Sequence, residues 1–118
     1  MSKTENITEE HLKKQAKELF FYKGLLDAST QEIADYAGIN RTLVNYYFRS
    51  KKNLFDIVYQ ETIDEMMHNY AAIYTSTVPF RKKIENIIDF TIEFRSKYPY
   101  IEVFNIQETY KLNSNCLY

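Results

Sequence analysis

Cysteine pairs, chain breakers and long apolar runs are scarce in this sequence. Its 118 residues include one Cys, two Gly, two Pro and no Trp. The single cysteine, Cys116, cannot form an internal disulfide, and the polar first ten residues lack a secretory core, so we expect a cytoplasmic protein. No apolar run approaches the roughly 20 residues that a membrane helix needs, and we expect no membrane partner.

Patterns that indicate catalysis or metal binding are also missing. His68 follows Glu65 by three residues, a spacing that metal-binding helices use, but no second His or Cys lies near them. The acidic residues are scattered, and the sequence has no nucleophile–histidine–carboxylate set and no glycine-rich phosphate loop. We therefore expect no enzyme activity, no metal and no other cofactor.

The charges are unevenly divided although the net charge is only −1. Residues 1–52 contain nine basic and seven acidic residues, whereas residues 53–118 contain six basic and nine acidic ones. A mildly basic front and an acidic rear weakly favour a nucleic-acid-binding head on a different kind of body.

The apolar residues recur with helical spacing throughout, which predicts an all-α fold. Capping residues and breakers set the expected helix limits. The predicted helices run from Thr8 to about Gly24, from Thr30 to Gly38, over Arg41–Phe48, from Lys51 to about Tyr74, from Pro79 to Pro99, and over about Tyr100–Tyr110. Residues 113–118 have no strong pattern.

The second and third predicted helices are short and separated by a turn that contains Gly38, which predicts a helix-turn-helix over Thr30–Phe48. The outer face of the third helix carries Arg41, Thr42 and Asn45. Arginine can pair bidentately with guanine and asparagine with adenine, and the start of this helix usually meets base edges. We predict that these three residues read DNA bases.

A second group of side chains flanks that face and can bind phosphates through hydroxyl groups, an ammonium group or helix N-termini. The predicted backbone contacts are Ser29, Thr30, Tyr46, Tyr47 and Lys51.

Several linked motifs resemble the N-terminal domain of the TetR repressor family. They are Ala16-Lys17-Glu18-Leu19-Phe20, Lys23-Gly24, Ser29-Thr30-Gln31-Glu32-Ile33-Ala34, Ala37-Gly38-Ile39, Tyr46-Tyr47-Phe48 and Ser50-Lys51-x-x-Leu54. The resemblance implies a three-helix DNA-binding head over residues 1–52. It also implies that a long fourth helix joins this head to the first part of a helical ligand-binding and dimerisation body over residues 53–118.

The resemblance further implies a repressor that occupies an inverted-repeat operator in double-stranded DNA as a homodimer. A small-molecule effector would release it by moving the fourth helix. By position, Arg41 and Thr42 match base-reading sites, and Thr30, Tyr46, Tyr47 and Lys51 match phosphate contacts. Thr42, Leu43 and Asn45 depart from the commonest pattern, so base preference does not transfer.

The length of the body leaves alternatives open. Family members usually continue past residue 118, so the chain is either a truncated regulator or one that dimerises differently. We expect Phe90, Phe94, Ile101 and Phe104 to be partly uncovered and to cause self-association. The stripe from Ile84 to Tyr98 fits a ligand pocket and a packed core equally well. The alternative function is a helical protein-interaction module without operator binding.

Overall fold

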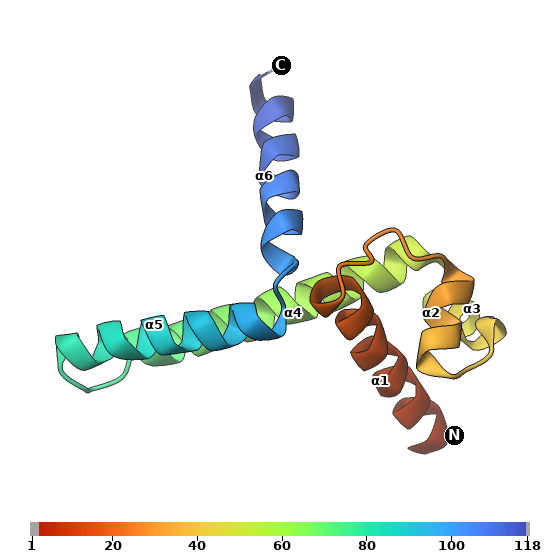
Figure 1. Cartoon of the computed structure of the whole chain (residues 1–118), viewed down its shortest axis with the longest axis horizontal. Coiled ribbons are helices and arrows are strands. Elements are labelled where there is room, and N and C mark those ends of the chain that lie inside the picture. Colours follow the sequence, from red (N-terminus) through yellow and green to blue (C-terminus); the bar gives the residue numbers. More distant parts are fainter. Residues whose placement is uncertain (1–2, 118) are drawn as a thin grey trace.

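The chain folds into helices, as the computed structural model of residues 3–117 shows (Figure 1); side chains are described for these residues except 3–7, 108 and 111–117. No strand occurs within this range, so the all-α prediction is confirmed. The elements are α1 (Lys3–Lys17), a π-helical turn η1 (Glu18–Tyr22), α2 (Thr30–Ala37), α3 (Arg41–Phe48), α4 (Lys51–Tyr74), α5 (Phe80–Lys97) and α6 (Ile101–Leu117).

The helices form a head at one end and an elongated body (Figure 1). The head consists of α1, α2 and α3, which gather around the first part of α4. Helix α5 returns alongside α4 as an antiparallel pair, and α6 then rises away from this pair. Helix α4 therefore belongs to both parts, because its first turns pack on the head and its last turns pack on α5.

Side-chain caps set three of the helix starts as the sequence predicts. Ser29 and Glu32 form a complete capping box at the start of α2. The side chain of Asn40 accepts a hydrogen bond from the Thr42 amide at 2.8 Å, and that of Ser50 accepts one from the Asn53 amide at 3.1 Å. These bonds satisfy amides that have no partner inside the helix, which fixes where α2, α3 and α4 begin.

The first helix differs from its prediction at its start and in the form of its last turn. It begins at Lys3, so Thr8 lies inside α1 and does not cap it. At its other end the backbone widens into η1, where three consecutive side chains, Leu19, Phe20 and Phe21, are all buried. Gly24 then ends the helix in the left-handed conformation, with φ of +78°. The sequence predicted this stop but not the wide turn before it.

One hydrophobic core joins the head to the body. Its largest fully buried side chains come from several elements: Leu12, Phe20, Phe21, Ile33, Val44, Leu54, Val58 and Ile101. Phe20 and Phe21 place their rings 4.8 and 5.6 Å from that of Phe55 on α4, and Phe55 in turn lies 4.5 Å from Phe104 on α6. Aromatic contacts thus run from the head through α4 to α6.

Two parallel ion pairs add polar contacts between α1 and α4. Lys13 lies 2.8 Å from Glu61, and Lys17 lies 3.5 Å from Glu65. Burial alone would lower the pKa of the Lys13 ammonium, but its hydrogen bonds to Glu61 and Glu10 outweigh that effect and raise the pKa. Lys13 therefore stays charged and keeps α1 in register with α4.

A close backbone contact joins η1 to the start of α6. The amide of Tyr100 donates a hydrogen bond to the Phe21 carbonyl at 2.9 Å, which supplies a partner to the end of the first helix. The Tyr100 ring lies directly on Gly24, where an added Cβ would come within 2.7 to 2.8 Å of three ring atoms. Glycine is thus favoured at position 24 by its φ, and a larger residue there would also have to displace the Tyr100 ring.

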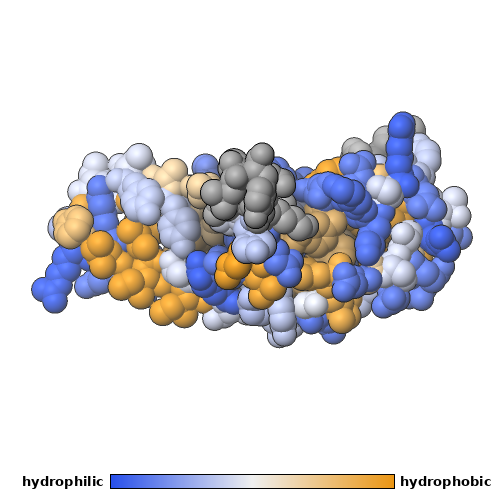
Figure 2. All heavy atoms as spheres, turned by 90° about the horizontal axis from the view of Figure 1, so that it is seen from above, coloured by the Kyte–Doolittle hydropathy of each residue, from blue (hydrophilic) through white to orange (hydrophobic). Residues whose placement is uncertain are grey.

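The prediction that four apolar side chains of the body are partly uncovered is confirmed for two of them and wrong for the other two. Phe94 and Ile101 are buried, whereas Phe90 and Phe104 are half-buried and pack on the α4 rings of Tyr70 and Phe55. The exposed residues instead form a stripe along α5: Phe80 (78% exposed), Ile84 (41%), Ile88 (51%) and Ile92 (61%). Hydrophobic side chains gather over the end of the molecule where α4 and α5 pair (Figure 2).

Helix α6 is also longer than predicted. It continues to Leu117, although the sequence pattern indicated an end near Tyr110 and gave no structure for residues 113–118. Side-chain positions beyond Tyr110 lie outside the described residues. The described apolar side chains of α6 that are exposed are Val103, Ile106 and Tyr110. Their exposure agrees with the direction of α6, which projects away from the α4–α5 pair (Figure 1).

Candidate nucleic-acid interface

The turn between α2 and α3 has the geometry that the sequence predicts. Gly38 adopts φ of +70°, and the Ile39 amide donates to the Ala34 carbonyl at 3.0 Å. Ile33, Ala34 and Val44 are buried in the angle between the two helices. A small residue at position 34 lets α3 approach closely, and the buried contacts then hold its orientation relative to α2.

Helix α3 has one buried face and one solvent-exposed face. Val44 and Phe48 pack into the core, whereas Arg41, Thr42 and Asn45 are exposed. The three predicted base-reading side chains therefore lie on the surface of one helix that is free to enter a major groove, which is about 12 Å wide. An interior position for any of them would have excluded that role.

The two tyrosines at the end of α3 have different surroundings. Tyr46 is largely exposed, and Tyr47 is half-buried against the core. Their rings meet edge to face, with centroids 5.1 Å apart. This contact restricts the orientation of the Tyr46 ring at the edge of the outer face, where its hydroxyl can reach a phosphate.

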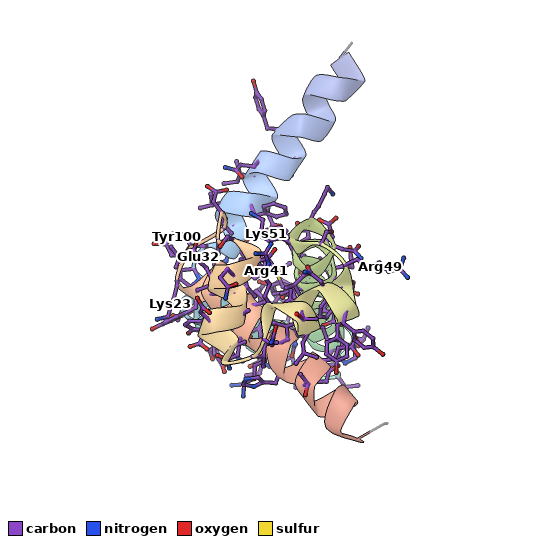
Figure 3. All side chains as sticks on the ribbon, turned by 90° about the vertical axis from the view of Figure 1, so that its right-hand side faces the viewer. Lys23, Glu32, Arg41, Arg49, Lys51 and Tyr100 are labelled. Carbon is purple, nitrogen blue, oxygen red and sulfur yellow. The ribbon has the colours of Figure 1, made fainter. Side chains whose placement is uncertain are left out.

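The cations at the two ends of α3 and at the start of α4, Arg41, Arg49 and Lys51, have no carboxylate within ion-pair distance among the described residues. Seen from the head end, Arg41 and Lys51 lie toward the middle of the view, and Arg49 extends away to one side (Figure 3). Lys52, by contrast, pairs with Asp56 at 2.9 Å. Cations without a protein partner add a positive potential around α3 that suits a phosphate backbone.

Ser29 and Thr30 lie at the start of α2, the helix that packs against α3. The Ser29 hydroxyl oxygen accepts from the Glu32 amide at 3.1 Å, which leaves its O–H free to donate to a phosphate. Ser29 is exposed and Thr30 is half-buried. With Lys51 in the first turn of α4, two helix N-termini lie beside α3, and both favour anions.

Arg49 is the one head cation whose geometry the sequence did not predict. It follows α3 with φ of +68°, the only positive φ among the described non-glycine residues. With ψ of −34° this residue lies outside the left-handed α region, in a sparsely populated conformation that costs about 1–3 kcal/mol. The sequence assigns Arg49 no role, because no sequence signal distinguishes this strained position from an ordinary helix end.

Two other predictions concern sites outside this interface. His68 is exposed, and no group of three His, Cys, Asp or Glu side chains able to hold a metal occurs among the described residues. His11 instead donates from Nε2 to the Ala37 carbonyl at 2.8 Å, which ties α1 to the end of α2. Within residues 3–117, no helix is both long and apolar enough to cross a membrane.

The comparisons with known proteins agree with this geometry. Residues 13–58 match the family described as bacterial regulatory proteins, tetR family. The matched segment begins within α1, contains all of α2 and α3, and ends within α4. No solved structure matches the chain significantly. The chain therefore carries the N-terminal DNA-binding domain of the tetR family and is a DNA-binding transcriptional regulator.

Proposed function

We propose that this regulator is a repressor that reads an inverted-repeat operator as a homodimer and is released by a small molecule. The exposure of Arg41, Thr42 and Asn45 on one face of α3 carries the proposal. These residues form the proposed base-reading set. Ser29, Thr30, Tyr46, Tyr47 and Lys51 form the proposed set of phosphate contacts.

The course of α4 supports release by a ligand. Its first turns belong to the head and its later turns to the body, so a shift of α4 reorients α3 relative to the body. The ion pairs of Lys13 and Lys17 and the contact of Tyr100 with Gly24 transmit such a shift to α1. We propose that the functional division falls after residue 52, with the reading head before it and the regulatory body after it.

The small number of base pairs that one DNA-binding head can contact favours binding as a dimer. One short recognition helix meets only a few base pairs, and dimers of such heads read two half-sites about one helical turn of DNA, or a multiple of a turn, apart. The exposed stripe on α5 supports self-association, because large apolar patches on a protein surface mark interaction sites.

Substitution of Arg41 and Lys51 separates sequence reading from phosphate binding. Arg41→Ala should weaken binding to the preferred duplex by about 1–3 kcal/mol and relax the preference at one base position. Lys51→Ala should weaken binding to all duplexes alike and reduce the slope of affinity against salt by about one unit. Fluorescence anisotropy with a duplex selected from a random pool, repeated over a range of salt concentrations, measures both effects.

Lys82→Ala is the matched control for these two variants. Lys82 is exposed near the start of α5, far along the chain from the head, and should leave both DNA affinity and the salt slope unchanged. If Arg41→Ala alters neither affinity nor base preference, the proposed reading role is wrong. A chain that binds no duplex at low salt would support the helical interaction module instead.

The α5 stripe gives a prediction about self-association. The wild-type chain should scatter light as a species heavier than its 14.2 kDa monomer, and Ile88→Glu should shift it toward the monomer. A carboxylate in the middle of an apolar contact is costly to bury, which is the reason for the shift. Leu25→Glu, at an exposed apolar residue of the head, is the control and should not change the mass.

A further inference from the structure

Arg49 occupies a tight and strained turn between α3 and α4. Its φ is +68° and its ψ is −34°, and the Ser50 amide donates a hydrogen bond to the Phe48 carbonyl at 2.8 Å. A hydrogen bond of this span, around a residue with positive φ and negative ψ, is the mark of a classic γ-turn, which is rare and strained. Glycine would adopt this backbone at little steric cost, because it has no Cβ.

Hydrogen bonds from the start of α4 hold this turn in place. The side-chain amide of Asn53 donates to the same Phe48 carbonyl at 2.9 Å, and the backbone amide of Asn53 donates to the Ser50 hydroxyl oxygen at 3.1 Å. Strained residues persist only where their surroundings fix them, and they cluster at functional sites. The turn therefore fixes the position from which the Arg49 side chain leaves the backbone, although an arginine is a costly residue there.

The guanidinium group of Arg49 is available to a ligand from outside the chain. The residue is exposed, and its side chain has no ion pair, hydrogen bond or aromatic contact with any residue that the structure describes. Seen from the head end, Arg49 extends outward from the ribbon (Figure 3). Lys52, three residues further on, is by contrast paired with Asp56 at 2.9 Å. The fold thus holds Arg49 at a cost without using its charge.

We propose that Arg49 binds a phosphate of the DNA backbone that borders the major groove entered by α3. An α-helix rises about 1.5 Å per residue, so Arg49 lies roughly 12 Å along α3 from Arg41, at the end opposite the one that usually meets base edges. The major groove is about 12 Å wide, so this opposite end comes close to the bordering backbone. The proposal rests on DNA binding by the tetR-family domain and needs neither repression nor dimerisation.

Three substitutions of Arg49 separate its charge from its turn. Arg49→Ala keeps the strained backbone but removes the charge, so it should weaken binding to every duplex roughly tenfold and lower the salt slope by about one unit for each bound head. Arg49→Lys keeps the strain and the charge and should keep the slope. Arg49→Gly removes the charge and relieves the strain, so it should bind as weakly as Arg49→Ala while its melting temperature rises by a few degrees. Fluorescence anisotropy of the full chain with a selected and an unrelated duplex, over a range of salt concentrations, and thermal melting measure these effects.

Arg81→Ala is the matched control, because it removes an exposed arginine near the start of α5 and should leave affinity and salt slope unchanged. The proposal is overturned if Arg49→Ala binds with the wild-type affinity and slope, or if it changes the base preference instead. It is also overturned if Arg49→Lys loses the slope as Arg49→Ala does, since the residue would then act through the turn alone. These outcomes leave DNA binding by the domain intact, whereas a wild-type chain that binds no duplex would overturn both conclusions.

Discussion

Phe20→Ala should lower the free energy of unfolding by about 3–5 kcal/mol, the range for removing a buried aromatic ring. Phe20 is fully buried and contacts both Phe21 and Phe55, so its loss opens a cavity between η1 and α4. A loss of this size is comparable to the total stability of many small domains, about 5–15 kcal/mol. Urea denaturation followed by circular dichroism measures it.

Leu25→Ala is the control for the loss of Phe20. Leu25 lies five residues further on but is 49% exposed, so its truncation should change stability by less than about 0.5 kcal/mol. Equal losses in the two variants would contradict the assignment of Phe20 to the shared core. Loss of the Phe20 ring should also weaken DNA binding, because the head and α4 are held together by these rings.

Gly24→Ala should be the most disruptive of the single-methyl additions. The left-handed backbone of residue 24 costs a side-chain-bearing residue about 1–2 kcal/mol, and the new Cβ must also displace the Tyr100 ring, at about 1–3 kcal/mol for overpacking. The expected drop in the free energy of unfolding is therefore about 2–5 kcal/mol. Thermal and urea unfolding measure it.

Gly38→Ala separates the two causes, because Gly38 has nearly the same φ but no atom within 4 Å of an added Cβ. The Gly38→Ala variant should therefore lose only the backbone cost, about 1–2 kcal/mol of the free energy of unfolding. In the Gly24→Ala background, Tyr100→Ala should restore part of the stability, since it removes the ring that the methyl group meets. The same loss for both glycine variants, with no restoration, would show that Tyr100 plays no part.

The helix-turn-helix is the part of the fold that the sequence predicted best. Its limits depend on neighbours in the chain: Ser29 and Glu32 cap α2, Gly38 ends it, and Asn40 caps α3. Interactions over three or four residues decide each of these points, so one sequence is sufficient to locate them. The exposure of Arg41, Thr42 and Asn45 follows from the same periodicity once Val44 is assigned to the core.

Features that depend on distant contacts were predicted poorly. The burial of Phe94 and Ile101 in the shared core depends on packing between elements far apart in the chain, which no local pattern reveals. The stripe from Ile84 to Tyr98 divides into two faces, since Phe94 and Tyr98 are buried while Ile84 and Ile88 are exposed. The contact of the Lys17 ammonium group with the Tyr98 ring was missed for the same reason, because the two residues are far apart in the sequence.

The wide turn η1 makes the orientation of the head depend on the number of residues in one short segment. Each residue of an ordinary α-helix turns the chain by roughly 100°. Removing one residue between Glu18 and Tyr22 would let the segment close as a regular helix but would rotate α1 by about that angle relative to Gly24. Lys13 and Lys17 would then point away from Glu61 and Glu65. Homologous chains with a one-residue deletion here should therefore have lost both ion pairs together, or have moved their partners on α4.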